Sequence, residues 1–322
     1  MRSSKRYYIG IDGGGTKTIG LLCNQDGVIL AKSTAGSTNL KSRSEKDVRA
    51  AIHVVVTELT SGLKGGELEG VFVSTAGGDR EEDQKRWKRW AMERLPGFDG
   101  ELEVRNDAYG ALASGTYSME GTVLIAGTGS IAYAIDSGKT RRAGGWGYLF
   151  GDEGSGYDIG QQALRTVAMM HDGRKESDDA FCIEVLSFLK LHYAPEMITA
   201  IYEDPYARMK IASIAQVVML LAEKQNQTAL GLIQKAQEDL IDLVNGIEIG
   251  NEKIVICGGL MQSSFFRGSF LDRMKKNGIS NVSYPELSPA AGACICALCE
   301  GGIAMTRQRE ENLRSSYRMM DG

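Results

Sequence analysis

The sequence is poor in several residue types, and each shortage narrows what the chain can be. Its 322 residues include only 5 prolines, 3 histidines and 6 cysteines. The cysteines show no disulfide or zinc spacing, so we expect free thiols in a reducing cytoplasm. Apolar runs are far shorter than the roughly 20 residues that span a bilayer, and the N-terminus does not fit a signal peptide. A formal charge of −4 gives no general reason to expect nucleic-acid binding.

Glycine, in contrast, is abundant, with 40 residues. Excess glycine without proline indicates tight turns and close backbone approaches rather than disorder. The first glycine cluster, DGGGTKT at residues 12–18, lies between two expected strands, 7–11 and 19–23. A dinucleotide-binding motif or a P-loop would open into a helix, so this position excludes both.

The strand–turn–strand pattern recurs at residues 122–135, around a second glycine turn at 127–130. The repetition predicts a duplicated α/β domain, and the length suits about two domains. We place the boundary near residues 117–121 and expect an N-terminal domain 1–117 and a C-terminal domain 118–322. Helical apolar patterns in the second half cover residues 158–171, 179–191, 210–224 and 228–245.

Both glycine turns are candidate phosphate-binding sites, because consecutive backbone N–H groups in a tight turn form a concavity that suits phosphate oxygens. Asp12, at the end of the first strand, is placed to hold Mg²⁺ through water, since Mg²⁺ prefers few carboxylates and several waters. Either turn alone could be a plain hairpin connection, but two at equivalent places favour the binding of a polyphosphate such as ATP. The candidate residues are Gly13, Gly14, Gly15, Thr16 and Lys17 in the first turn and Gly127, Thr128 and Gly129 in the second.

Asp107 follows the expected strand 101–105 and precedes an expected helix. A carboxylate at the carboxyl end of such a strand points into the ligand-binding crevice of an α/β fold. It could take the proton from a sugar hydroxyl as that oxygen attacks phosphorus. Asp is also a favoured helix N-cap, and the sequence leaves both roles open.

The segment GGWGYLFGDEGSGYDIG, residues 144–160, holds candidate sugar contacts. Trp146 could cover the apolar face of a sugar, and Asp152 could accept hydrogen bonds from its hydroxyls. Gly145 and Gly147 would let the backbone approach the ligand. The alternative is a core tryptophan beside a turn.

Two shorter segments are further candidates for the sugar pocket. Gly77 and Gly78 follow an expected strand in STAGGDR, which could equally be a simple strand-to-helix turn. Asn39 is a short amide able to bond hydroxyls. Three cysteines in ACICALCE (294, 296 and 299) are more typical of a buried helix than of a metal site, because the chain has no matching cysteine pair to complete four ligands.

These segments together resemble those of the N-acetylhexosamine kinases of the actin-like ATPase superfamily, within the group that also holds the ATPase activators of benzoyl-CoA reductases and dehydratases. The resemblance extends over nearly the whole chain in the order of the family. The segments that carry it are IGIDGGGTKT, STAGGDR, NDAYGAL, IAGTGSIAY, GGWGYLFGDEGSGYDIG, CGGL and SPAAGA.

The resemblance implies a fold of two ribonuclease-H-like domains around a cleft, and it implies residue roles. Asp12 and Thr16 match the first phosphate motif, Thr128 the second, and Asp107 the catalytic base. Gly258 and Gly259 match the turn beside adenosine, and Ser213 falls near an adenine contact. The positions that match sugar contacts are Asn39, Gly145, Trp146, Gly147 and Asp152.

The implied activity is phosphorylation of an N-acetylated amino sugar, N-acetylglucosamine or N-acetylmuramic acid, at its 6-hydroxyl by ATP and Mg²⁺. Unacetylated glucosamine stays open as a substrate, and so does a homodimer. The activator branch is the alternative, but it carries cysteines for an iron–sulfur cluster that we do not find. Nucleic-acid and membrane partners are not expected.

Overall fold

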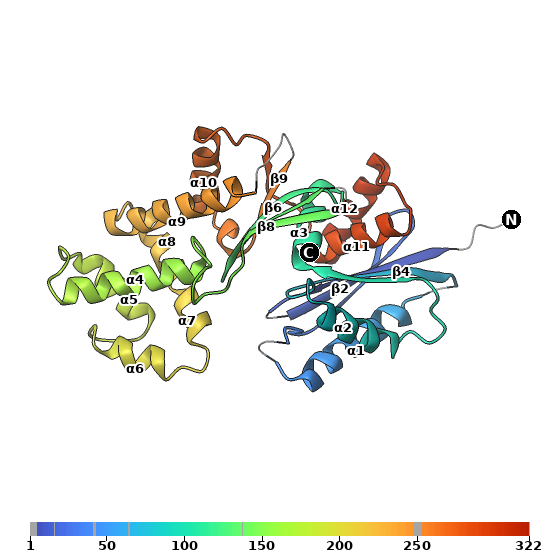
Figure 1. Ribbon diagram of the computed structural model, residues 1–322, viewed down its shortest axis with the longest axis horizontal. Helices are drawn as coiled ribbons and strands as arrows, with labels where there is room; N and C mark the ends of the chain where they lie inside the picture. The colour runs from blue at the N-terminus through green and yellow to red at the C-terminus, as the bar shows by residue number, and fades with distance from the viewer. Residues whose placement is uncertain are drawn as a thin grey trace. The chain divides into compact units, whose positions relative to one another are not determined.

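The computed structural model describes residues 5–15, 17–40, 43–63, 65–136, 138–247 and 253–321. The chain forms two compact units, one of Met1–Gly121 with Pro285–Gly322 and one of Thr122–Tyr284. Each unit contains a five-stranded sheet with helices packed against it (Figure 1). No helix in the described ranges is long and apolar enough to cross a membrane.

The sheet of the first unit has the strand order β3-β2-β1-β4-β5. Its strands are β1 (Arg6–Gly13), β2 (Lys17–Asn24), β3 (Ile29–Gly36), β4 (Glu67–Thr75) and β5 (Glu101–Asn106). β1 pairs antiparallel with β2 and parallel with β4, and β4 pairs parallel with β5. The carboxyl ends of β1, β4 and β5 therefore meet at one edge of this sheet.

Successive side chains of β1 point to opposite faces of this sheet. Ile9 and Ile11 pack in one core with α1 (Glu45–Ser61) and α2 (Glu81–Met92). Gly10 faces the other way, against α11 (Pro289–Glu300), beside which lies α3 (Asp107–Thr116). Asp12 is in phase with Gly10, so its carboxylate lies on the face that α3 and α11 cover.

The C-terminal segment packs with the first unit, which differs from the expected C-terminal domain of 118–322. The small residues of α11 allow its backbone to approach its neighbours closely. A Cβ placed on Gly292 would lie 1.8 Å from the carbonyl oxygen of Gly110, and one on Gly10 would lie 2.1 Å from the backbone nitrogen of Cys294. The polar tail forms α12 (Arg307–Asp321), where Ser316 Oγ accepts a hydrogen bond of 2.9 Å from the backbone N–H of Ile29.

The second unit repeats the strand–turn–strand pattern in a sheet of order β10-β9-β6-β7-β8. Its strands are β6 (Gly121–Ala126), β7 (Ser130–Asp136), β8 (Lys139–Gly144), β9 (Ile254–Cys257) and β10 (Val282–Ser283). Its helices are α4 (Gly156–His171), α5 (Asp179–Phe188), α6 (Glu196–Tyr202), α7 (Ala207–Ser213), α8 (Ala215–Glu223), α9 (Gln227–Asn245), the short 3₁₀ helix η1 (Gly259–Gln262) and α10 (Ser264–Lys276). One hydrophobic core joins β6, β7 and β9 to this helical layer (Figure 1).

Candidate active site

The first glycine turn joins β1 to β2, as the sequence predicts. The N–H of Gly14 donates to the carbonyl of Lys17 at 3.1 Å, and Ser37 Oγ donates to the carbonyl of Gly14 at 3.2 Å. Asn39 lies beside the turn, since a Cβ on Gly15 would be 3.8 Å from its amide nitrogen. Gly15 and Lys17 are exposed, which leaves the tip of the turn open to a ligand. Thr16 lies outside the described residues.

Asp12 and Asp107 form a pair of partly buried carboxylates next to this turn. Burial, and then the negative charge of Asp107, raises the pKa of Asp12 to about 7, against the opposing effect of Lys17. Burial, and then the charge of Asp79, raises the pKa of Asp107 to about 6, although backbone N–H groups at the start of α3 oppose the rise. The sheet edge thus brings together two carboxylates whose pKa values lie near neutral pH.

Asn106, rather than Asp107, is the N-cap of α3. Its Oδ1 accepts from the N–H of Ala108 at 2.9 Å, and its Nδ2 donates to Asp79 Oδ2 at 3.0 Å. The buried hydroxyl of Ser74 accepts from the N–H of Gly110 at 2.9 Å and so fixes the first turn of the helix. Asp107 is therefore not needed for capping. The sequence gives no signal for the positioning roles of Ser74 and Asn106.

Gly77 and Gly78 lie in the turn after β4, at the same sheet edge as Asp107. Gly78 packs tightly on β5, because a Cβ there would lie 2.1 Å from the carbonyl oxygen of Arg105. Gly77 has φ +87°, a conformation that favours glycine. The next residue in this turn is Asp79, whose charge acts on Asp107.

In the second unit, the Gly127–Gly129 turn rests on the start of α4. The N–H of Gly127 donates to the carbonyl of Gly129 at 2.9 Å, and the N–H of Gly156 donates to the carbonyl of Gly127 at 2.7 Å. The predicted adenosine-side residues are adjacent, since a Cβ on Gly127 would lie 3.4 Å from the nitrogen of Gly259. Gly258 packs more closely on Ala126, because a Cβ there would lie 2.3 Å from the carbonyl oxygen of Ala126.

Ser213 ends α7, and its hydroxyl donates to the carbonyl of Lys210 at 2.7 Å. A Cβ on Gly156, at the start of α4, would lie 3.3 Å from the carbonyl oxygen of Ala212. Since the N–H of Gly156 holds Gly127, the end of α7 lies close behind the second glycine turn.

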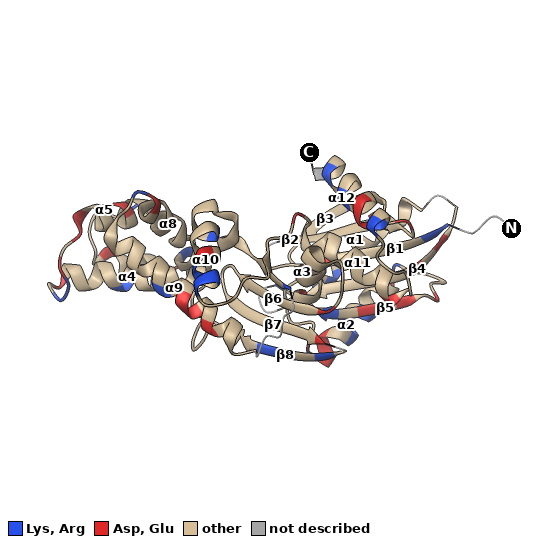
Figure 2. Cartoon of the chain, turned by 90° about the horizontal axis from the view of Figure 1, so that it is seen from above, with Lys and Arg blue, Asp and Glu red and all other residues tan. Residues whose placement is uncertain are grey.

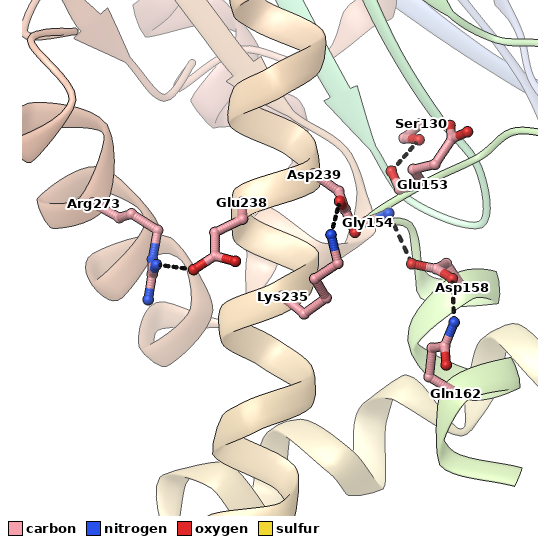
Figure 3. A network of polar contacts seen from close by, with 9 residues as sticks. All are labelled: Ser130, Glu153, Gly154, Asp158, Gln162, Lys235, Glu238, Asp239 and Arg273. Carbon is pink, nitrogen blue, oxygen red and sulfur yellow. Dashed lines mark hydrogen bonds and ion pairs between the residues drawn. The ribbon is translucent and has the colours of Figure 1, made fainter. Parts of the chain in front are cut away.

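Asp152 is buried beneath the second turn, with its backbone at φ +63°. Its carboxylate accepts from the N–H of Ser130 at 3.3 Å and from Arg208 Nη2 at 2.9 Å. Ser130 Oγ in turn donates to the carbonyl of Glu153 at 2.7 Å (Figure 3). These bonds brace the end of the turn. The bond from Arg208 could not be predicted, because no sequence motif includes this residue.

The chain after Asp152 is fixed in the same way to α4. The N–H of Gly154 donates to Asp158 Oδ2 at 3.0 Å, and Gln162 donates to the other oxygen of that carboxylate at 3.4 Å (Figure 3). Glu153 itself is exposed. The segment therefore couples the second turn to the helix that supports it.

Trp146 does not lie in a core: its side chain is 61% exposed, so the buried-tryptophan alternative is wrong. The N–H of Gly145 donates to the carbonyl of Ser130 at 3.0 Å and ties this segment to the second turn. The guanidinium of Arg142 lies 4.9 Å from the centre of the Trp146 ring. Gly147 has φ +90°, with open space around the position of a Cβ.

Cys294 and Cys296 are buried in α11, and Cys299 is partly buried at its end. Within the described part of the chain, no three or more His, Cys, Asp or Glu side chains cluster as metal ligands would. A metal ion at Asp12 would therefore take most of its ligands from phosphate and water.

The chain belongs to the BadF/BadG/BcrA/BcrD ATPase family, which it matches over residues 9–297. It is 33% identical to an N-acetylmuramic acid/N-acetylglucosamine kinase of Clostridium acetobutylicum, over 92% of this chain and 99% of that protein. It is 32% identical to an N-acetyl-D-glucosamine kinase of Dictyostelium discoideum, over 92% and 98%.

A solved structure supports the same fold. A Chromobacterium violaceum protein assigned as an N-acetylglucosamine kinase superposes with a TM-score of 0.71 at 25% identity, covering 91% of this chain and 99% of that one. The two α/β units with their five-stranded sheets are those of the actin-like ATPase fold, as the sequence predicts.

Proposed function

We propose that the protein is an ATP-dependent kinase that phosphorylates an N-acetylated amino sugar, N-acetylglucosamine or N-acetylmuramic acid, at its 6-hydroxyl. The family and the sugar-kinase names of the two relatives that match nearly the whole chain support this activity. The observation that carries the chemistry is the carboxylate pair Asp12 and Asp107 beside a glycine turn.

Asp107 is the proposed general base. A base works best when its pKa is near the working pH, and burial with the charge of Asp79 raises the pKa of Asp107 to about 6. At neutral pH most Asp107 carboxylates are ionised yet basic enough to accept the proton of the sugar hydroxyl. Ser74 and Asn106 hold the first turn of α3 through hydrogen bonds. Because Asp107 lies in this turn, its backbone position is fixed.

In this proposal the backbone N–H groups of each glycine turn bind phosphate oxygens of ATP, and the turn at Gly258 and Gly259 lies on the adenosine side. Asp12 fits an Mg²⁺ ion held mainly by phosphate and water, because it is a partly buried carboxylate at the first turn. When bound, Mg²⁺ would neutralise charge that develops on the transferring phosphoryl group.

The sugar contacts proposed are Asn39, beside the first turn, and the segment around Trp146, beside the second. Gly77 and Gly78 close the turn next to Asp107. Asp152 would reach the sugar only by sharing its carboxylate with Ser130 and Arg208, which already bind it.

A coupled ADP-release assay over a panel of amino sugars tests the proposal, with the phosphorylated carbon assigned by NMR. We expect release with N-acetylglucosamine, N-acetylmuramic acid or both, and phosphate on the 6-oxygen. Asp107→Asn should lower kcat by roughly 10²- to 10⁴-fold while ATP still binds. If none of the sugars stimulates ADP release, the proposed function fails. A dehydratase activator would instead show an iron–sulfur absorbance after anaerobic purification.

A further inference from the structure

Arg142 is a cation placed against the segment proposed to bind the sugar. It lies on β8, an edge strand whose basic residues are blue in Figure 2, opposite Tyr133 of β7. Its guanidinium lies 4.9 Å from the centre of the exposed Trp146 ring. Trp146 follows Gly145, whose N–H is bonded to Ser130 at the end of the second glycine turn. Only a few residues therefore separate this positive charge from the phosphate-binding backbone.

Arg142 contacts no carboxylate among the residues that the structure describes. The other arginine that stacks near this segment, Arg208, lies over Tyr148 but is neutralised by Asp152 at 2.9 Å. Arg142 is instead held by stacking alone, which orients the planar guanidinium and leaves its N–H donors available. A preoriented cation costs less to order when an anion binds.

We infer that the guanidinium of Arg142 binds a carboxylate on the sugar and so recognises it. A neutral sugar such as N-acetylglucosamine offers this guanidinium only uncharged acceptors, its hydroxyls and its acetamide carbonyl, whereas the lactyl ether of N-acetylmuramic acid carries a carboxylate that a guanidinium can bind with two parallel hydrogen bonds. The inference rests on the proposed function, and it narrows the preferred substrate to N-acetylated amino sugars that bear a carboxylate. Arg142 is a specificity residue in this account and takes no part in phosphoryl transfer.

The test compares kcat/KM for N-acetylmuramic acid, its neutral lactyl amide and N-acetylglucosamine at saturating ATP. The amide has nearly the same shape as the acid, so their ratio isolates the charge. We expect the wild type to prefer the acid over the amide by about 10-fold, the scale of one charge-assisted hydrogen-bonded pair at a partly hydrated site. Arg142→Gln should abolish that preference and change kcat/KM for N-acetylglucosamine less than about 3-fold, because the neutral sugar loses no ion pair.

Arg141→Gln is the matched control, because Arg141 is the neighbouring residue of the same strand and its side chain points to the opposite face. It removes the same charge and should keep the preference for the acid. Raising the salt concentration should weaken the preference in the wild type, since exposed ion pairs are screened.

The outcomes separate this inference from the proposed function. Turnover of N-acetylglucosamine with equal rates for acid and amide in the wild type would overturn the role of Arg142 and leave the kinase intact. The role of Arg142 would also be overturned if Arg142→Gln kept the preference for the acid, or if Arg141→Gln lost it too. It would likewise be overturned if the main effect of Arg142→Gln were a higher KM for ATP, because Arg142 would then bind phosphate. No turnover of any sugar would instead refute the kinase itself.

Discussion

Replacing Asp107 by Asn should stabilise the first unit while it removes activity. A carboxyl whose pKa is about 6 in the folded chain and 3.8 ordinarily is disfavoured as an anion by folding. The difference is about two pKa units at 1.36 kcal/mol each, on the order of 3 kcal/mol at pH 8. The value of about 6 already contains the opposing backbone N–H groups, so this is a net cost. Removing the Asp107 charge also relieves Asp12, whose pKa that charge helps to raise.

The sign of the pH dependence follows from linkage. Below about pH 4 the carboxyl is protonated in both states, so Asp107→Asn should change stability little. Between about pH 4 and pH 6 the unfolded chain has lost this proton while the folded wild type still holds it, so the stability of the wild type falls relative to the variant as the pH rises towards 6. The gain of the variant should therefore be absent at pH 4 and complete at pH 8.

Thermal unfolding measured by intrinsic fluorescence suits this test, because the buried Trp87 and Trp90 both lie on α2 of the first unit. In a chain of this size 1 kcal/mol corresponds to about 2 °C, so we expect a Tm about 6 °C higher at pH 8. Asp47→Asn is the control, because Asp47 is an exposed carboxylate in the first turn of α1. This substitution should lower the free energy of unfolding by up to about 1 kcal/mol. An unchanged or lower Tm for Asp107→Asn at pH 8 would refute the reasoning, and so would an equal gain at pH 4.

Three further predictions follow from the same geometry. The kcat/KM for ATP should fall below about pH 7, where Asp12 takes up a proton. The kcat/KM for the sugar at saturating ATP should fall only below about pH 6, where Asp107 takes up a proton. If both values fell at the same pH, the separate roles of the two carboxylates would be contradicted. Gly292→Ala should cost about 1–3 kcal/mol in thermal unfolding because its Cβ meets the backbone of α3, while Gly268→Ala, in open space on α10, should gain about 0.5–1 kcal/mol. Asp152→Ala should raise the KM for ATP by about 10-fold, since Ser130 loses its acceptor, and Asp152→Asn, which keeps an acceptor, should raise it less.

Local features of the site could be predicted from the sequence because a few adjacent residues determine them. A glycine run between two apolar runs must turn, and both turns indeed join neighbouring strands of a sheet, which are antiparallel for β1 and β2. The position of Asp107 after a strand has the same local origin. These segments also carry the family resemblance, which the match over residues 9–297 confirms.

Contacts between distant residues could not be predicted in this way. Arg208 and Asp152 are 56 positions apart, and nothing in either segment indicates the other. The apolar pattern over 210–224 predicts one helix, yet α7 ends at Ser213 and α8 begins at Ala215. There the Ser213 hydroxyl bonds back to the carbonyl of Lys210, and the N–H of Ile214 bonds to Ile211, three residues earlier, so the helix tightens locally.

The boundary expected near residue 117 lies close to the division between Gly121 and Thr122, but the C-terminal segment returns to the first unit, and this return explains how the carboxylate pair is held. If each domain were one continuous stretch of chain, α11 would belong to the second unit. Instead, α11 packs between β1 and α3 in the first unit. Gly10 of β1 and Gly110 of α3 both meet its backbone at distances that a Cβ would not allow. Asp12 lies two residues after Gly10, and Asp107 three before Gly110. Helix α11 therefore sets the spacing between Asp12 and Asp107, although it contributes no charged side chain to the pair.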